Sequence, residues 1–192
     1  VFAPGVEDIY QGKTNASHIE YDGIENEMEG KHRPGHFDGV GTIVKKLFEI
    51  VKPNNAYFGE KDFQQLQIVK KLVQKNNLPV SIIGCDIYRE ENGLAMSSRN
   101  VRLSVLSRNH AALIYKILKQ TKIMFGTKST SEITKWVEKE LKKDSLITLE
   151  YFEIADIETL KGCLRKSKQK KYRAFIAVLI DNIRLIDNIS LN

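Results

Sequence analysis

A strand–helix–strand pattern in residues 54–88 constrains the fold of this chain more than any other feature. Residues 56–58 (AYF) are apolar and follow an Asn-Asn turn signal, as expected for a short buried strand. Residues 62–75 carry apolar side chains at helical spacing, and residues 80–88 (VSIIGCDIY) return to a strand-like apolar run. Because a strand–helix–strand connection within one sheet is right-handed and its strands are parallel, we expect a parallel α/β domain here.

This domain is expected to be incomplete at its N-terminus. An amphipathic helix precedes it over residues 42–51 (TIVKKLFEIV) and ends at Pro53. Doubly wound sheets usually contain about five or six strands. Only two or three strand patterns precede residue 88, and the chain opens with Val-Phe-Ala-Pro and no Met. Residues 1–87 are therefore expected to be the C-terminal part of a Rossmann-like domain.

The second half of the chain has a different pattern. Ser104 can cap a long helix, and a Gly-Thr-Lys-Ser turn leads to a second helix. The elements expected here are helices at 104–124 and 131–143 and strands at 146–155, 172–180 and 183–187, the last two joined by an Asp181-Asn182 hairpin. The expected fold class is thus α/β, with an incomplete Rossmann-like domain at 1–87 and a small α+β domain with antiparallel strands at 88–192.

Two short segments carry the chemistry of phosphate binding. Gly59-Glu60-Lys61-Asp62 lies between a strand and a helix, where backbone N–H groups and an ammonium can meet an anion. Met96-Ser97-Ser98-Arg99 adds two hydroxyls and a guanidinium fork in a polar loop. Either segment alone is weak evidence. Their joint occurrence, with Gln64 and Gln65 just inside the helix, indicates a nucleotide site.

Each of these residues also has a simpler structural explanation. Asp62 could merely cap the helix start, and Ser97 and Ser98 could stabilise a turn. Gln64 is expected to be exposed or structural. A lone loop histidine such as His36 more often makes a structural hydrogen bond than it transfers protons.

Composition limits the classes of function and location. The net charge is +6 and the pI about 9.2, which suits anionic small molecules but also a basic nucleic-acid binder. No run of interleaved aromatic and basic residues supports nucleic-acid binding. Cys85 and Cys163 are far apart, so free thiols are expected, with no metal site. The chain has no signal sequence and no apolar run of about 20 residues, so we expect a soluble cytoplasmic protein with no membrane partner.

Three segments in order, HFDGVGTIVKKLF, NAYFGEKDFQQL and REENGLAMSSRNVRLS, resemble the pantothenate synthetase (pantoate-beta-alanine ligase) family. The resemblance covers essentially the whole chain and is strongest over 33–103. It implies a nucleotidylyltransferase domain of Rossmann type, a C-terminal lid domain and a homodimer. In that family ATP lies between a His-x-Gly-His element and a later loop, which Met-Ser-Ser-Arg resembles. The 192 residues contain no His-x-Gly-His, so this chain alone is expected to be inactive.

The resemblance implies a two-step ligation with ATP as a substrate and Mg²⁺ as its counterion. Pantoate attacks the α-phosphorus of ATP with loss of pyrophosphate, and β-alanine then attacks the pantoyl adenylate to give pantothenate and AMP. Such chemistry needs stabilised phosphate charge and an in-line carboxylate. Another adenylate-forming enzyme with a different acid acceptor is the alternative. Gln65 and the Arg-Pro-Gly-His segment that begins at Arg33 favour pantoate.

The family pattern also assigns roles to individual residues. The ATP-binding set it implies is Gly59, Glu60, Lys61, Asp62, Tyr88, Met96, Ser97, Ser98 and Arg99. Within it, Gly59 and Asp62 would hold the ribose and the backbone of Tyr88 would read adenine. The catalytic residues would be Lys61, Ser97, Ser98 and Arg99. Gln65 would bind pantoate, with Arg33 and Glu29 near the same substrate, and no residue is assigned to a metal.

Overall fold

The computed structural model describes residues 1–10, 12 and 18–192. The chain divides into two compact units. The first unit comprises residues 1–58 and 64–84, and the second comprises residues 59–63 and 85–192. The short segment 59–63 therefore belongs to the second unit, although the chain on both sides of it belongs to the first. Each unit is described by itself below.

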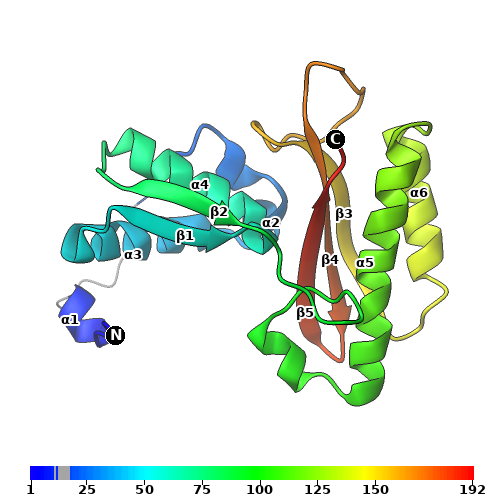
Figure 1. The fold of residues 1–192 in the computed structure, drawn as a ribbon, viewed down its shortest axis with the longest axis horizontal. Helices are drawn as coiled ribbons and strands as arrows, with labels where there is room; N and C mark the ends of the chain where they lie inside the picture. The colour runs from blue at the N-terminus through cyan, green and yellow to red at the C-terminus, as the bar shows by residue number, and fades with distance from the viewer. Residues whose placement is uncertain (11, 13–17) are drawn as a thin grey trace. The chain divides into compact units, whose positions relative to one another are not determined.

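The first unit contains a pair of neighbouring parallel strands and their helices (Figure 1). Its elements are α1 (Val6–Tyr10), η1 (Ile24–Asn26), α2 (Met28–His32), α3 (His36–Val51), β1 (Asn55–Gly59), α4 (Phe63–Lys75) and β2 (Ser81–Cys85). Helix α4 buries Leu66, Ile68, Val69 and Leu72 at 2% exposure or less, as its helical spacing of apolar residues predicted. The strand–helix–strand order is confirmed.

Helix α3 begins earlier than the sequence pattern indicated. Gly35 adopts φ 76°, a left-handed conformation that costs glycine little, and the helix begins at the next residue. Phe37 in the first turn is buried. The polar and glycine-rich start of the helix hid it from the periodicity argument, which placed its beginning near residue 42.

The second unit is a three-stranded antiparallel sheet with two helices (Figure 1). Its elements are η2 (Glu60–Asp62), η3 (Ser98–Arg102), α5 (Val105–Phe125), α6 (Thr130–Leu141), β3 (Thr148–Asp156), β4 (Tyr172–Ile180) and β5 (Ile183–Ser190). The strands lie in the order β3-β4-β5. Asp181 and Asn182 adopt φ 52° and 59°, the positive values that a two-residue hairpin with the right twist requires.

The two faces of this sheet have different partners. Alternate residues of β4, including Ala174, Ile176 and Val178, join the apolar core that α5 and α6 complete with Leu118 and Ile133. The other set of alternate residues in β4 therefore faces away from the helices. Two of those residues, Arg173 and Phe175, contact the segment 59–63.

Strands β2 and β5 differ in length from the expectation. Strand β2 ends at Cys85. The chain then folds back on itself over residues 88–96, which we call the bracket, and Arg89 and Ala95 form an isolated antiparallel bridge within it. Strand β5 continues past Asp187, because Asp187 and Asn188 pair in register with Ile176 and Phe175 of β4. Two adjacent polar residues suggested a strand end, but both side chains are buried with partners. None of the helices in the described part of the chain is both long and apolar enough to cross a membrane.

We expect the capping box of α6 to contribute measurably to stability. The Ser129 hydroxyl accepts the Glu132 N–H at 3.2 Å, and the Glu132 carboxylate accepts the Ser129 N–H at 2.8 Å. Ser129→Ala should lower the free energy of unfolding by about 1 kcal/mol, because one helix N–H loses its acceptor. Urea denaturation checks this. Ser131→Ala, an exposed change in the same helical turn, is the control, and an equal loss in both variants would contradict the capping role.

Candidate nucleotide site

The segment that contains Gly59-Glu60-Lys61-Asp62 is held on the open face of the antiparallel sheet by Asn188. The Asn188 side-chain amide donates to the carbonyl oxygens of Glu60 at 2.9 Å and Lys61 at 2.8 Å. Asn188 is 1% exposed and lies opposite Phe175 in the β4–β5 register. The segment forms a 3-10 turn, η2, so its first N–H groups have no partners within the turn itself.

Arg173 makes a second attachment of the same segment. Its guanidinium donates to the Glu60 carboxylate at 2.8 Å and to the side-chain oxygen of Asn188. The same group lies over the Phe63 ring, 4.2 Å from its centroid, and the Phe63 and Phe175 rings are 5.9 Å apart between centroids. The Glu60 side chain is thus part of an ion pair with the sheet.

Lys61 and Asp62 have a different environment. The Lys61 side chain is half-buried and Asp62 is exposed. Lys61 forms no ion pair with any residue that the structure describes. Its positive charge acts on the buried Asp187 carboxylate and opposes the rise in pKa that burial causes there. An ammonium without a carboxylate partner on an anchored turn can meet an anionic ligand.

The second segment, Met96-Ser97-Ser98-Arg99, is attached to the start of β5. The Arg99 guanidinium donates to the Arg184 carbonyl at 3.0 Å, which uses one of its five N–H donors. Ser97 caps the short helix η3, since its hydroxyl oxygen accepts the Arg99 N–H at 3.2 Å. That bond leaves the hydroxyl hydrogen of Ser97 able to donate. Ser98 and Arg99 are exposed.

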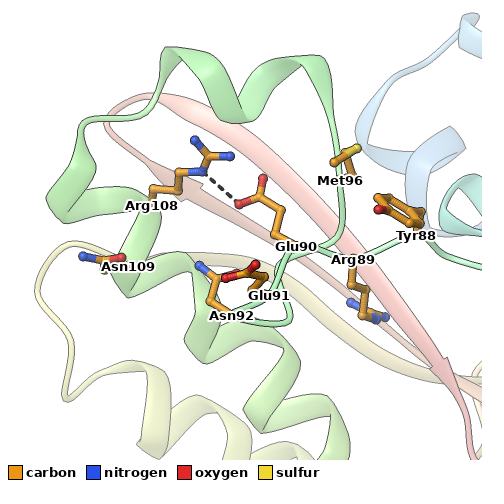
Figure 2. Close-up of a pocket in the computed structure, with 8 residues that line it drawn as sticks. All are labelled: Tyr88, Arg89, Glu90, Glu91, Asn92, Met96, Arg108 and Asn109. Atoms are coloured by element: carbon orange, nitrogen blue, oxygen red, sulfur yellow. Dashed lines mark hydrogen bonds and ion pairs between the residues drawn. The ribbon is translucent and has the colours of Figure 1, made fainter.

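The two sides of a local bracket hold Tyr88 beside Met96. The Met96 N–H donates to the Tyr88 carbonyl at 2.9 Å, and the side chains of both residues are largely exposed. A cavity of about 480 Å³ opens at this bracket (Figure 2). The residues that line it are Tyr88, Arg89, Glu90, Glu91, Asn92, Met96, Arg108 and Asn109. Its volume suits a small ligand.

Glu90 stabilises the wall of this cavity. It accepts from Arg108 at 2.8 Å and from the buried Asn100 side chain at 2.7 Å, and Figure 2 shows Glu90 and Arg108 pointing toward each other. The hydrogen bond from Arg108 lowers the pKa of Glu90 below its usual range, with a further contribution from Asn100. Glu90 therefore connects the bracket both to Asn100, which directly follows the Ser-Ser-Arg segment, and to helix α5.

Arg89 points from the bracket to β5. Its guanidinium donates to the two Asp187 carboxylate oxygens at 2.6 and 3.0 Å and lies over the Tyr115 ring, 3.7 Å from the centroid. Asp187 is 3% exposed. Burial raises the pKa of its carboxyl, while the ion pair with Arg89 and the charge of Lys61 oppose that shift. The bracket is thus fixed to the sheet by a buried ion pair.

The residues expected to bind pantoate lie in the first unit. Gln65 is half-buried in the first turn of α4. Its neighbour Gln64 is 4% exposed and bonds the carbonyls of Ile24 and Glu27 and the N–H of Glu29, so it is structural. Arg33 follows α2 and lies 3.7 Å from Glu29.

His36 makes a side-chain hydrogen bond, as expected, but it lies in a helix rather than in a loop. It begins α3 and lies 3.2 Å from the Arg33 guanidinium, with its ring against Phe37. Within the described residues, no group of three His, Cys, Asp or Glu side chains could hold a metal ion. Cys85 is exposed and Cys163 buried, and both are free thiols.

Sequence reasoning missed the side chains that attach these segments to the sheet. They are Arg89, Arg173, Asp187 and Asn188. One signal was available: RLIDNIS interrupts an apolar strand with two adjacent polar residues, one on each face. Buried polar side chains need partners, which such a strand must take from another segment. The identity of that segment could not be read from the strand.

An α/β fold with two phosphate-type segments is typical of nucleotide-binding proteins. The family model for pantoate-beta-alanine ligase matches residues 1–190. The pantothenate synthetase of Flavobacterium psychrophilum is 65% identical over 191 residues, which span 100% of this chain and 68% of that protein. The chain belongs to the pantoate-beta-alanine ligase family.

Solved structures agree with the fold. A crystal structure of pantothenate synthetase from Thermus thermophilus matches with a TM-score of 0.90 at 38% identity, over 99% of this chain and 68% of that chain. The pantoate-beta-alanine ligase of Francisella tularensis, complexed with beta-gamma ATP and beta-alanine, matches with a TM-score of 0.73 at 34% identity, over 96% of this chain and 62% of that chain. The expected fold class is confirmed.

The ionised form of Glu90 should stabilise the cavity wall in a pH-dependent way. Since its pKa is lowered on folding, its contribution is present above the ordinary glutamate pKa of about 4.3 and is lost as the pH falls through its folded-state value. Glu90→Gln should therefore lower the melting temperature at neutral pH, and its gap to the unmodified chain should narrow below about pH 4. Glu91→Gln is the control. A gap that widens in acid would contradict this linkage.

Proposed function

We propose that this chain supplies ATP-binding and acid-activating residues for the ligation of pantoate and β-alanine to pantothenate. One observation carries the proposal. Both phosphate-type segments, 59–62 and 96–99, belong to the second unit, and each is attached to β5. Family membership supports this reaction, and the Francisella relative was crystallised with beta-gamma ATP and beta-alanine.

The reaction has two steps in this proposal. The pantoate carboxylate oxygen attacks the α-phosphorus of ATP, a P–O bond forms, and the bond to pyrophosphate breaks. The β-alanine amine then attacks the carbonyl carbon of pantoyl adenylate, loses a proton, and AMP leaves. Both steps depend on orientation and on stabilising negative charge at phosphate oxygens, and neither needs a covalent bond to the protein.

The proposed roles follow from the donors of each segment. Lys61 would stabilise phosphate charge, because its ammonium has no ion-pair partner among the described residues. Ser97, Ser98 and Arg99 would contribute hydroxyl and guanidinium donors from the other segment. The backbone of Tyr88 would read adenine, and Met96 would close over the phosphates with its three neighbours. Glu60, a member of the predicted ATP-binding set, acts there through its backbone, because its carboxylate binds Arg173.

The remaining roles concern the ribose and pantoate. Gly59 and Asp62 are both exposed and would meet the ribose hydroxyls. Gln65 would donate its amide to pantoate, with Arg33 nearby on the pantoate side. Mg²⁺ would neutralise the departing pyrophosphate, as membership of the family implies. We also propose a homodimer in the cytoplasm, a compartment that suits free thiols.

The test of the reaction uses two proteins. The first is the 192-residue chain, and the second joins it to the part of the Flavobacterium psychrophilum relative that it does not match. With ATP, Mg²⁺, pantoate and β-alanine, the joined protein should form AMP and pantothenate in equal amounts. The 192 residues alone should show no turnover, because they contain no His-x-Gly-His for the other side of the phosphates.

Two controls make this test decisive. Omission of pantoate should abolish AMP formation, and omission of β-alanine should stop the reaction at enzyme-bound adenylate. AMP formation that ignores pantoate would point to a different acid acceptor. Equal turnover by the two proteins would contradict the proposed inactivity of the 192 residues.

Lys61→Ala should slow the first step in the joined protein. Loss of a donor to developing phosphate charge typically costs about 10² to 10³ in rate, with a smaller effect on ATP affinity. Single-turnover adenylation and the Kd for ATP measure the two effects. Lys70→Ala, which removes an exposed lysine from α4, should change neither. If Lys61→Ala lowers the melting temperature but leaves adenylation normal, Lys61 has only a structural role.

A further inference from the structure

Two adjacent residues of β5 each hold one of the segments assigned to ATP. Asp187 binds the Arg89 guanidinium through both carboxylate oxygens, next to Tyr88. Asn188 bonds the carbonyls of Glu60 and Lys61. Successive residues of a strand point to opposite faces of the sheet. The two attachments therefore lie on opposite faces of β5, at adjacent residues.

Every polar group of the Asn188 side chain is used. Its NH₂ group donates to two carbonyls, and its oxygen accepts from Arg173. Its backbone N–H also donates to the Asp187 carboxylate at 2.8 Å, which joins the two attachments directly. The side chain is buried and fully bonded, so it has one defined orientation.

This attachment fixes the direction of the backbone donors. A trans peptide is planar, so each N–H points away from the carbonyl of the same peptide unit. The carbonyls of Glu60 and Lys61 point toward Asn188, and the N–H groups of Lys61 and Asp62 are therefore directed away from it. These two N–H groups lie in η2, and the proposed function assigns them to the phosphates of ATP.

Asp187 acts on the bracket in the same way. Arg89 follows Tyr88 directly and also donates to the Gly93 carbonyl at 3.1 Å, inside the bracket. With Tyr115 beneath its guanidinium, Arg89 has a buried carboxylate on one side and an aromatic face on the other. The ion pair thus fixes the residue beside the cavity of Figure 2.

We propose that Asp187 and Asn188 are positioning residues that set the spacing between the bracket, residues 88–96, and the phosphate turn, residues 59–62. Their Cα atoms are about 3.8 Å apart on one strand, so the places where the two segments are attached keep a fixed separation. This inference rests on the proposed function for its consequence, ATP binding. The attachment itself is testable without any nucleotide.

The nucleotide-free test is hydrogen exchange in the 192-residue chain. Asn188→Asp keeps the shape but replaces the donating NH₂ with an oxygen, which repels both carbonyls. Amide exchange in 59–63 should rise about tenfold, while α6 is unchanged. Asn188→Ala, which adds no charge, should produce the same rise if the aspartate variant does not fold. Asn192→Asp is the matched control, because Asn192 also donates to a carbonyl, that of Lys170.

The attachment through Asp187 is tested separately, by hydrogen exchange in a second variant. Asp187→Asn removes the charge that pairs with Arg89 and should raise exchange in residues 88–96 more than in 59–63. Unchanged exchange at 59–63 in both Asn188 variants, or at 88–96 in Asp187→Asn, would overturn the inference whatever the chain does with ATP.

A double-mutant cycle tests whether the hydrogen bonds from Asn188 position Lys61. The single-turnover rate of adenylation is measured in the joined protein for Lys61→Ala, Asn188→Asp and the double variant. If Asn188 positions Lys61, the effect of Lys61→Ala should be about fivefold smaller in the Asn188→Asp background. Additive effects would overturn the positioning role while leaving the proposed function intact. Absence of ATP binding by the unmodified protein would overturn the proposed function, and the exchange result would then still decide the attachment.

Discussion

The hydrogen bonds from Asn188 to the carbonyls of Glu60 and Lys61 are the interaction on which the candidate site depends. The segment 59–63 has too few residues to build a core of its own. It is fixed because a buried amide, an arginine and a pair of phenylalanine rings in contact hold it against the antiparallel sheet. The phosphate turn is therefore part of the second unit, although the chain on both sides of it belongs to the first unit.

Burying charged side chains for this arrangement costs folding free energy. Arg89 and Asp187 form a buried ion pair, and such pairs rarely add net stability over apolar residues of similar size. Burial raises the pKa of the Asp187 carboxyl even with Arg89 beside it. The Nε atom of Arg173 is likewise buried without a hydrogen-bond partner among the described residues. Polar groups placed in a small core at this cost are better explained by the geometry they impose than by stability.

Several expectations from sequence agree closely with the structure, for local physical reasons. Strand β4 has the expected bounds, and Ser104 caps α5 by accepting the Ser107 N–H. The Asp181-Asn182 hairpin has the backbone angles that its residues favour. Apolar spacing, caps and tight turns act over a few residues, so a single sequence suffices to read them.

Candidate residues show the same division between local and distant information. The two phosphate-type segments could be found because their donors are contiguous in the chain. Glu60 was included with them, and only the fold shows that its carboxylate binds Arg173, far along the chain. Gln64 and Gln65 look alike in sequence, yet Gln64 is buried among the carbonyls of Ile24 and Glu27.

The sequence by itself determined the α/β class, the antiparallel C-terminal sheet and the family, because these follow from periodicity and from contiguous motifs. It did not determine to which strand the two phosphate-type segments are attached. That was decided by tertiary structure, in which Asp187 and Asn188 at the far end of the chain meet Arg89 and Lys61. Buried polar groups must find partners, but only the packing of the sheet decides which distant segment provides them.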